Sequence, residues 1–198
     1  AGHDMGAGAV RHPASETGNP LVDMQSSATS ARLDDPGIGL RDNGRKVLTH
    51  AELRSLFPDP DGREPGRTIE LHLTGNMEKF AWSFDGIPFA SAEPLLLKYG
   101  ERLRVVLVND TMMQHPIHLH GMWSDLEDEN GNFLVRKHTV DMPPGTRRSY
   151  RVRADALGAA IDQALTDADL RAAAERIQAS FAAAGGPVAA ADALIALA

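Results

Sequence analysis

The 198-residue sequence predicts a mainly β protein, an antiparallel β-sandwich that is followed by an α-helical C-terminal tail. Two observations support this prediction. Between residues 67 and 153 the chain consists of short extended runs bounded by turn residues, a pattern that is typical of sandwiches. After Gly158 the sequence becomes rich in alanine, and its apolar residues recur at helical spacing. We therefore expect roughly six strands in the first region and a pair of helices in the second.

Residues 1–45 form the first predicted segment. They are rich in Gly, Ala, Ser, Asp and Pro and show no steady apolar period, so we interpret them as a flexible N-terminal arm. His3 and Met5, in the stretch "GHDMG", are candidate soft ligands for a cuprous ion on this arm. Methionine is also a common packing residue near a β-sandwich, so both interpretations stay open.

The predicted sandwich domain occupies residues 46–158. In "RTIELHLT" apolar and polar residues alternate, as in a strand with one buried face. The run "VVLV", residues 105–108, is apolar on both faces, as in the core of a sandwich. The acidic run that contains Asp125 and Glu127 is interpreted as a solvated hairpin turn, because it lacks the glycine and the closing glutamate of a calcium loop. The extended runs are residues 67–74, 80–89, 94–110, 132–140 and 146–154.

Residues 159–198 form the third segment, the helical tail. Thr166 and Asp169 resemble the start of a capping box, and a Gly-Gly-Pro stretch supplies a stop. These signals predict helices over 167–184 and 188–197. The apolar residues that repeat with the helical period are Leu170, Ala174, Ile177 and Phe181.

The composition argues against several classes of function. The formal net charge of −7 is unlike the basic surface of a nucleic-acid-binding protein, so no nucleic-acid partner is expected. No apolar run approaches the roughly 18 residues of a membrane-spanning helix, and the first residues lack the pattern of a signal peptide. The chain contains no cysteine, which excludes a disulfide, a thiolate metal ligand and a cysteine nucleophile.

The stretch "HPIHLHG", residues 115–121, is the strongest candidate for metal chemistry. His118 and His120 point to the same side of an extended chain, because side chains alternate with period two. His115 can be aimed elsewhere, because Pro116 fixes the backbone after it. The spacing therefore predicts neighbouring metal sites rather than one pocket. Neutral imidazole suits copper, zinc, iron and nickel, while surface histidines or hydrogen-bonded core histidines are the alternatives.

Three stretches resemble a known family: "GNMEKFAWSFDGIPF", "MMQHPIHLHGMWSDLE" and "KHTVDMPPGTRRSYRVRADALG". They are similar to the last cupredoxin domain of the copper resistance protein A family, which are periplasmic multicopper oxidases of bacteria. The resemblance covers about residues 45–158. It implies a cupredoxin-like Greek-key β-sandwich, a copper cofactor and a periplasmic location. It also implies that His115 is a ligand of type 1 copper, His118 of type 2 copper and His120 of type 3 copper.

The sequence departs from this family after "RADALG". The family pattern continues with a His-Cys-His motif, a further histidine and an axial methionine, whereas this chain continues with predicted helices. The expected sandwich is therefore incomplete, with its last two strands replaced, and another chain is a possible source of the missing copper ligands. Without a cysteine thiolate, the copper-loaded protein is expected not to be blue.

The tail has a resemblance of its own. Residues 159–198 are similar to the C-terminal end of bacterial glycosyltransferases with two Rossmann domains. A generic pair of amphipathic helices is the alternative interpretation.

Three functional hypotheses remain. In the first, the chain is a copper-binding fragment of a copper-resistance multicopper oxidase, whose intact form couples copper-dependent oxidation to dioxygen reduction. In the second, it is a non-catalytic copper-binding module. In the third, it is a truncated or chimeric domain without retained activity. The sequence leaves open whether this chain is an enzyme by itself. In the first two cases copper(II) binding should depend on His118 and His120 above all, because His50, His72 and His138 each lie alone among residues typical of turn or strand surface.

Overall fold

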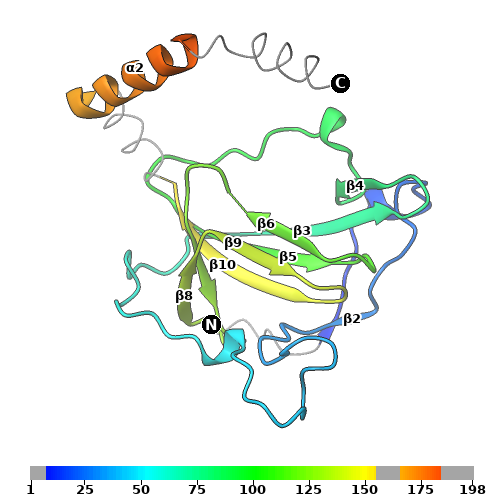
Figure 1. Cartoon of the computed structure of the whole chain (residues 1–198). Helices are drawn as coiled ribbons and strands as arrows, with labels where there is room; N and C mark the ends of the chain where they lie inside the picture. The colour runs from blue at the N-terminus through cyan, green and yellow to red at the C-terminus, as the bar shows by residue number, and fades with distance from the viewer. Residues whose placement is uncertain (1–7, 155–165, 184–198) are drawn as a thin grey trace, which may run out of the picture. The chain divides into compact units, whose positions relative to one another are not determined.

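The computed structural model of the chain describes residues 8–154 and 166–183 (Figure 1). The chain divides into two compact units, residues 1–155 and 156–198, which are described separately. The strands of the first unit are β1 (Gly8–Ala9), β2 (Ala28–Thr29), β3 (Arg67–Asn76), β4 (Ala81–Phe84), β5 (Arg102–Asn109), β6 (His115–His118), β7 (Ser124–Glu127), β8 (Phe133–Lys137), β9 (Thr139–Met142) and β10 (Arg147–Arg153). Its short 3₁₀ helices are η1 (Ala14–Glu16), η2 (His50–Glu52) and η3 (Phe89–Ser91).

Six strands form the main sheet, in the order β4, β3, β5, β10, β7 and β8. β3 and β5 run parallel, and the other neighbouring pairs are antiparallel. β6 and β9 form a separate antiparallel pair (Figure 1). The mainly β prediction is confirmed, with two differences. First, residues 67–153 contain eight strands rather than six, because β6 and β9 form an additional small layer. Second, β3 pairs in parallel with β5, because β4 and a long connection lie between them in the chain.

The apolar face of the main sheet and the β6–β9 pair enclose the hydrophobic core. Val140 and Met142 of β9 are fully buried in the same cluster as the sheet residues. Since β9 pairs with β6 along its whole length, this burial fixes the strand that carries the histidine motif. The sheet residues of the cluster are Leu73, Leu103, Val105, Leu107, Leu126, Leu134, Tyr150 and Val152.

The opposite face of the main sheet carries buried charged groups, because side chains alternate along each strand. Glu127 of β7 has no exposed side-chain surface and accepts hydrogen bonds from Arg104, at 2.7 Å, and from Ser149 and Arg151. Asp125 on the same strand pairs with two further arginines. The prediction of a solvated turn is wrong for Asp125 and Glu127, because β7 lies between β10 and β8 and both neighbours carry arginines on this face.

The segment before β3 differs from the predicted flexible arm, residues 1–45. Ala31 and Leu33 belong to the core cluster. Ser26 donates its backbone N–H to Oδ1 of Asp110 at 3.0 Å, which ties the segment to the end of β5. The segment is irregular, and its backbone groups find hydrogen-bond partners elsewhere in the fold rather than in a regular helix or strand. Such a segment has no periodic apolar pattern, so the sequence could not predict these contacts.

The described part of the second unit is helix α2 (Ala168–Ala183). Oδ1 of Asp167 accepts the backbone N–H groups of Asp169, at 2.9 Å, and Leu170, at 3.1 Å, which is the geometry of an N-cap. The first predicted tail helix is thus confirmed. The second, over 188–197, lies outside the described residues. Within the described ranges, no helix combines the length and the apolar character that a bilayer crossing requires.

Candidate metal centre

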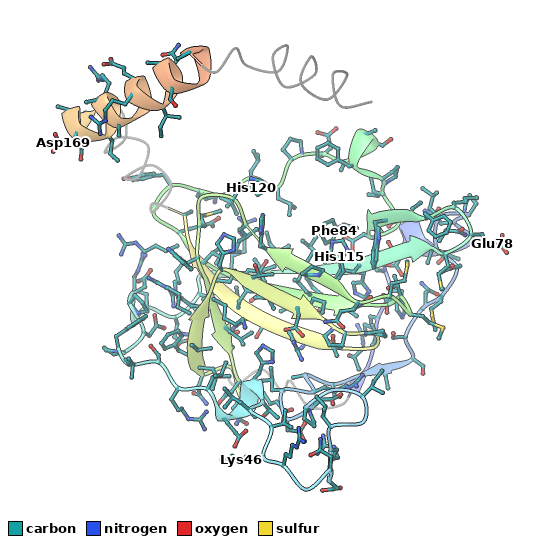
Figure 2. The ribbon with its side chains drawn as sticks, viewed as in Figure 1. Lys46, Glu78, Phe84, His115, His120 and Asp169 are labelled. Carbon is teal, nitrogen blue, oxygen red and sulfur yellow. The ribbon has the colours of Figure 1, made fainter. Side chains whose placement is uncertain are left out.

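Strand β6 carries His115 and His118, and the turn after it carries His120; Figure 2 labels His115 and His120. His115 and Ile117 are partly buried, whereas His118 and His120 are exposed. This alternation places His118 and His120 on one side of the chain and His115 on the other, as period two requires. Gly121 follows with a φ of 75°, a left-handed conformation that glycine adopts without strain, and the extended segment ends there.

His118 lies at the centre of three imidazoles. Its ring centroid is 4.8 Å from that of His120 and 4.9 Å from that of His138. We call these three residues the exposed histidine group. The expectation that His138 lies alone is wrong, because β6 pairs with β9 so that Thr139 is opposite His118. Trp123 borders the group, with its ring centroid 5.8 Å from that of His138.

His115 has a different environment. Its ring packs edge-on against Trp82 of β4, with centroids 4.3 Å apart. Partial burial lowers the pKa of His115 below its ordinary value, because the charged form loses hydration. The ring therefore favours the neutral form, which is the form that coordinates metal ions.

The exposed histidine group brings three accessible imidazoles onto one surface, and imidazole is a ligand that copper(II) accepts. His115 fits the thiolate-ligated copper site implied by the family resemblance less well, since the sequence contains no cysteine to accompany it. The two candidate ligands of the N-terminal stretch, His3 and Met5, lie outside the described residues.

Two other histidines have partners that their sequence context did not indicate. Nε2 of His50 lies 3.1 Å from Nζ of Lys137 and 3.4 Å from Oδ1 of Asp141, and burial lowers the pKa of His50. His72 is 2% exposed, with Nδ1 at 2.6 Å from Oδ2 of Asp110. Burial opposes a charge on His72, but the surrounding carboxylates outweigh it and raise the pKa to about 10. The surface expectation for His72 is wrong, because the N-terminal segment with His12 and Glu16 covers this face of β3.

Comparison with known proteins gives a consistent assignment. The sequence profile of the multicopper oxidase family matches residues 62–161. Copper resistance protein A of Escherichia coli is 78% identical over 151 residues, which cover 76% of this chain and 25% of that protein. A copper resistance protein A homolog of Pseudomonas syringae pv. tomato is 81% identical over 147 residues, which cover 74% of this chain and 25% of that protein. The chain thus spans about a quarter of the length of these relatives.

More distant similarities exist as well. Multicopper oxidase MmcO of Mycobacterium tuberculosis is 37% identical over 81 residues, which cover 41% of this chain and 16% of that protein. Among solved structures, a blue copper oxidase from Nitrosomonas europaea aligns with a TM-score of 0.42 and 19% identity, over 50% of this chain and 37% of that one. Fet3p, a multicopper oxidase that functions in iron import, aligns with a TM-score of 0.43 and 17% identity, over 58% of this chain and 31% of that one.

Proposed function

The chain belongs to the multicopper oxidase family, and we propose that it is a copper-binding part of a copper-resistance oxidase in which His118 and His120 are the principal ligands. The observation that carries this proposal is the exposed histidine group, in which both neighbouring ring centroids lie within 4.9 Å of that of His118. Copper is the cofactor of the family, and neutral imidazole is a good copper ligand.

The resemblance to the family gives each histidine of the motif a role. His115 corresponds to a type 1 ligand, His118 to a type 2 ligand and His120 to a type 3 ligand. In this proposal His118 and His120 supply one side of a copper cluster. The remaining ligands come from residues outside the described ranges or from another chain.

An exposed apolar segment between β4 and β5 supports such a partner. Phe89 is 97% exposed, Leu96 is 80% exposed and Tyr99 is 82% exposed. Exposed apolar side chains that follow one another along a segment are typical of an interaction surface, because their burial against a partner is favourable. Trp123, next to the exposed histidine group, is also more than half exposed. The partner in this proposal would cover the apolar segment and bring copper ligands with it.

The alternative function is a non-catalytic copper-binding module. The 198 residues include no cysteine, and a thiolate is the ligand that makes type 1 copper an efficient electron acceptor, so catalysis would need a thiolate from outside these residues. In both functions the exposed histidine group binds copper. They differ in whether the bound copper takes part in a catalytic oxidation.

We also propose a periplasmic location. The support for it is the high identity to copper resistance protein A over three quarters of this chain.

Metal analysis of the purified chain tests the proposed function. After copper(II) loading, mass spectrometry should find bound copper, and electron paramagnetic resonance should show nitrogen ligands. The chain with His118→Ala and His120→Ala should bind less copper and lose the part of this signal that comes from the exposed histidine group, while a His50→Ala chain should keep it. Copper that binds equally well to the double variant would contradict the proposal.

A further inference from the structure

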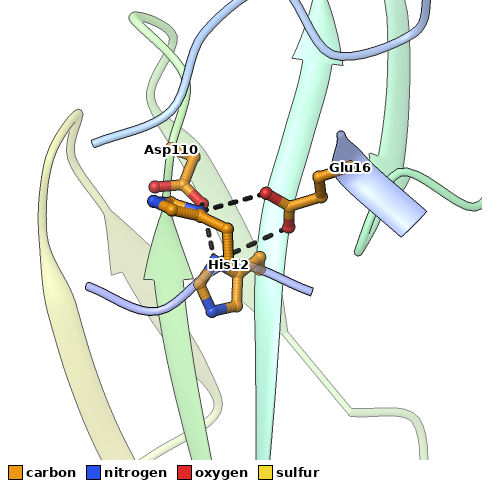
Figure 3. A group of neighbouring side chains, drawn as sticks. His12, Glu16 and Asp110 are labelled. Atoms are coloured by element: carbon orange, nitrogen blue, oxygen red, sulfur yellow. Dashed lines mark hydrogen bonds and ion pairs between the residues drawn. The ribbon is translucent and has the colours of Figure 1, made fainter. Parts of the chain in front are cut away.

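We infer that His12, Glu16, His72 and Asp110 form a second, closed site for a divalent transition ion, zinc(II) or copper(II). None of these residues belongs to the histidine motif, so this inference goes beyond the proposed function. Figure 3 shows His12 and Glu16 of the N-terminal segment converging with Asp110. His12 precedes η1, Glu16 ends η1, His72 comes from β3 and Asp110 follows β5.

The distances within this group fit a metal ion. One ligand atom from each of the four residues can be chosen so that all lie within 4.8 Å of one another. Nδ1 of His12 is 3.0 Å from Oε2 of Glu16 and 3.3 Å from Oδ2 of Asp110. Nδ1 of His72 is 2.6 Å from the same Asp110 oxygen and 3.7 Å from Oε1 of Glu16. Zinc–ligand bonds of about 2.0–2.2 Å place tetrahedral ligand atoms about 3.4 Å apart, so only small shifts would be needed.

One buried oxygen points to a missing ligand. The side chain of Glu16 has no exposed surface, and its Oε1 atom has no hydrogen-bond partner. A buried carboxylate oxygen without a hydrogen bond is costly, because it has lost its hydration and the nearest ring nitrogen, Nδ1 of His72, is 3.7 Å away. Its other oxygen, Oε2, accepts a hydrogen bond from Nε2 of Gln25 at 2.7 Å. A cation within the group would satisfy Oε1 directly.

The outer nitrogen of His12 is held as a metal ligand requires, and that of His72 faces a carboxylate at ion-pair distance. Nε2 of His12 lies 3.0 Å from the carbonyl oxygen of Ser26. A carbonyl can only accept, so this nitrogen carries a proton and Nδ1 faces the site. Nε2 of His72 lies 3.5 Å from Oε1 of Glu70. Donation from the outer ring nitrogen to a carbonyl or carboxylate is the usual support of a metal-binding histidine, because it fixes the tautomer and the ring orientation.

The ligand set selects the class of ion. Two imidazoles and two carboxylates suit zinc(II), and copper(II) binds such sites more tightly by the general order of affinities. Glu16, His72 and Asp110 are buried and His12 is only partly exposed, so the site is closed and its role is structural. The two carboxylates balance the charge of a divalent ion, which removes the main cost of burying it.

Protons compete for the same place. Nδ1 of His72 lies 2.6 Å from Oδ2 of Asp110, so in the metal-free protein a proton joins these two atoms where an ion would bind. Metal binding must displace that proton. The affinity should therefore rise with pH, and each bound ion should release protons.

The test uses the whole chain with His118→Ala and His120→Ala, which removes the exposed histidine pair so that the two proposals can fail separately. The chain is stripped with a chelator and titrated with zinc(II) and with copper(II) in calorimetry buffers of different ionisation enthalpy. We expect saturable binding of zinc, proton release and a higher melting temperature. Copper should displace the zinc. Adding Glu16→Gln should weaken zinc binding by at least about tenfold, since loss of even a supporting residue costs that much.

Glu78→Gln is the matched control, because Glu78 is an exposed glutamate in the turn after β3 (Figure 2). A second readout does not depend on a variant of the group itself. Cobalt(II) in the stripped chain should give the intense visible bands of a tetrahedral site. A folded chain that binds neither zinc nor copper, shows no such bands, or binds zinc equally well with Glu16→Gln would overturn the inference. The four residues would then be an ion network held by protons alone.

Discussion

The imidazoles of His118 and His138 meet edge to face, with ring centroids 4.9 Å apart and ring planes inclined by 75°. This relationship exists only because β6 and β9 pair. It adds a third imidazole to the two that the sequence motif supplies. His138→Ala should therefore weaken copper(II) binding by roughly 10- to 100-fold, the range expected for residues that support a metal site. Calorimetric titration measures this, with His50→Ala as the control; equal affinities of the two variants would show that His138 has no part in binding.

The double change His118→Ala with His120→Ala should remove the copper(II) that the exposed histidine group binds and releases as pH falls, and it should leave folding nearly intact. Both side chains are exposed, so their removal costs little packing, and only neutral imidazole binds the metal. Copper affinity measured over a range of pH, together with thermal melting, checks both halves of this prediction. A larger effect from His3→Ala with Met5→Ala would instead assign the copper to the N-terminal stretch.

The copper-loaded chain should lack an intense visible absorption band. The 198 residues include no cysteine, so no thiolate-to-copper charge transfer can occur. Absorption spectra recorded during copper titration test this. A strong blue color would show that the ligand set is wrong.

Copper bound at the exposed histidine group should quench Trp123 more than Trp82. The ring of Trp123 lies 5.8 Å from His138 by centroids, whereas Trp82 packs against His115. The chain has two tryptophans, so Trp82→Phe and Trp123→Phe each leave one reporter. Fluorescence titration of the two variants separates the sites. Preferential quenching of Trp82 would place the copper at His115.

Glu127→Ala should destabilise the fold by about 3–5 kcal/mol, the cost of breaking a buried ion pair. The change leaves Arg104 and Arg151 without their shared carboxylate on the buried polar face. Urea unfolding gives the free energy. Glu129→Ala, an exposed position next to this strand, is the control and should change stability little.

The metal-free chain should lose stability as pH rises from about 6.5 to about 10. The pKa of His72 is about 10 in the folded protein, raised by Asp110, Glu70 and Glu16 against the effect of burial. A raised folded pKa contributes stability that is complete below the unfolded value and disappears as pH passes the folded value. Unfolding free energies in chelator should fall over this window. His72→Gln should flatten the profile and His138→Gln should not.

Local patterns in the sequence predicted the local features well. Alternation gave the strand at β3 and the common side of His118 and His120, since both depend only on neighbouring residues. It did not predict the partner of His118, because β6 and β9 are joined only by long-range pairing. Charged residues of β7 looked solvated for a related reason: alternation separates the two faces of a strand but does not say which face another segment covers.

The group at His72 was beyond sequence reasoning because its members come from three separate segments: the N-terminal segment with His12 and Glu16, β3, and the end of β5. A lone histidine in an alternating strand resembles a surface residue until the covering segment is known. The acidic residue of that segment, Glu16, lies in a stretch without periodicity. Only the folded chain brings the two together.

The hydrogen bond from the backbone of Ser26 to Asp110 joins positions that are 84 residues apart. Closing so long a loop loses chain entropy, so contacts of this kind form late in folding. The N-terminal segment should therefore dock after the sheet has assembled. In hydrogen exchange it should be among the last parts to gain protection, and under mild denaturant it should open by a local transition before the sheet does. A metal ion bound by His12 and Asp110 would stabilise the docked segment and suppress this local opening. Docking of the segment would then be a slow step that depends on the ion.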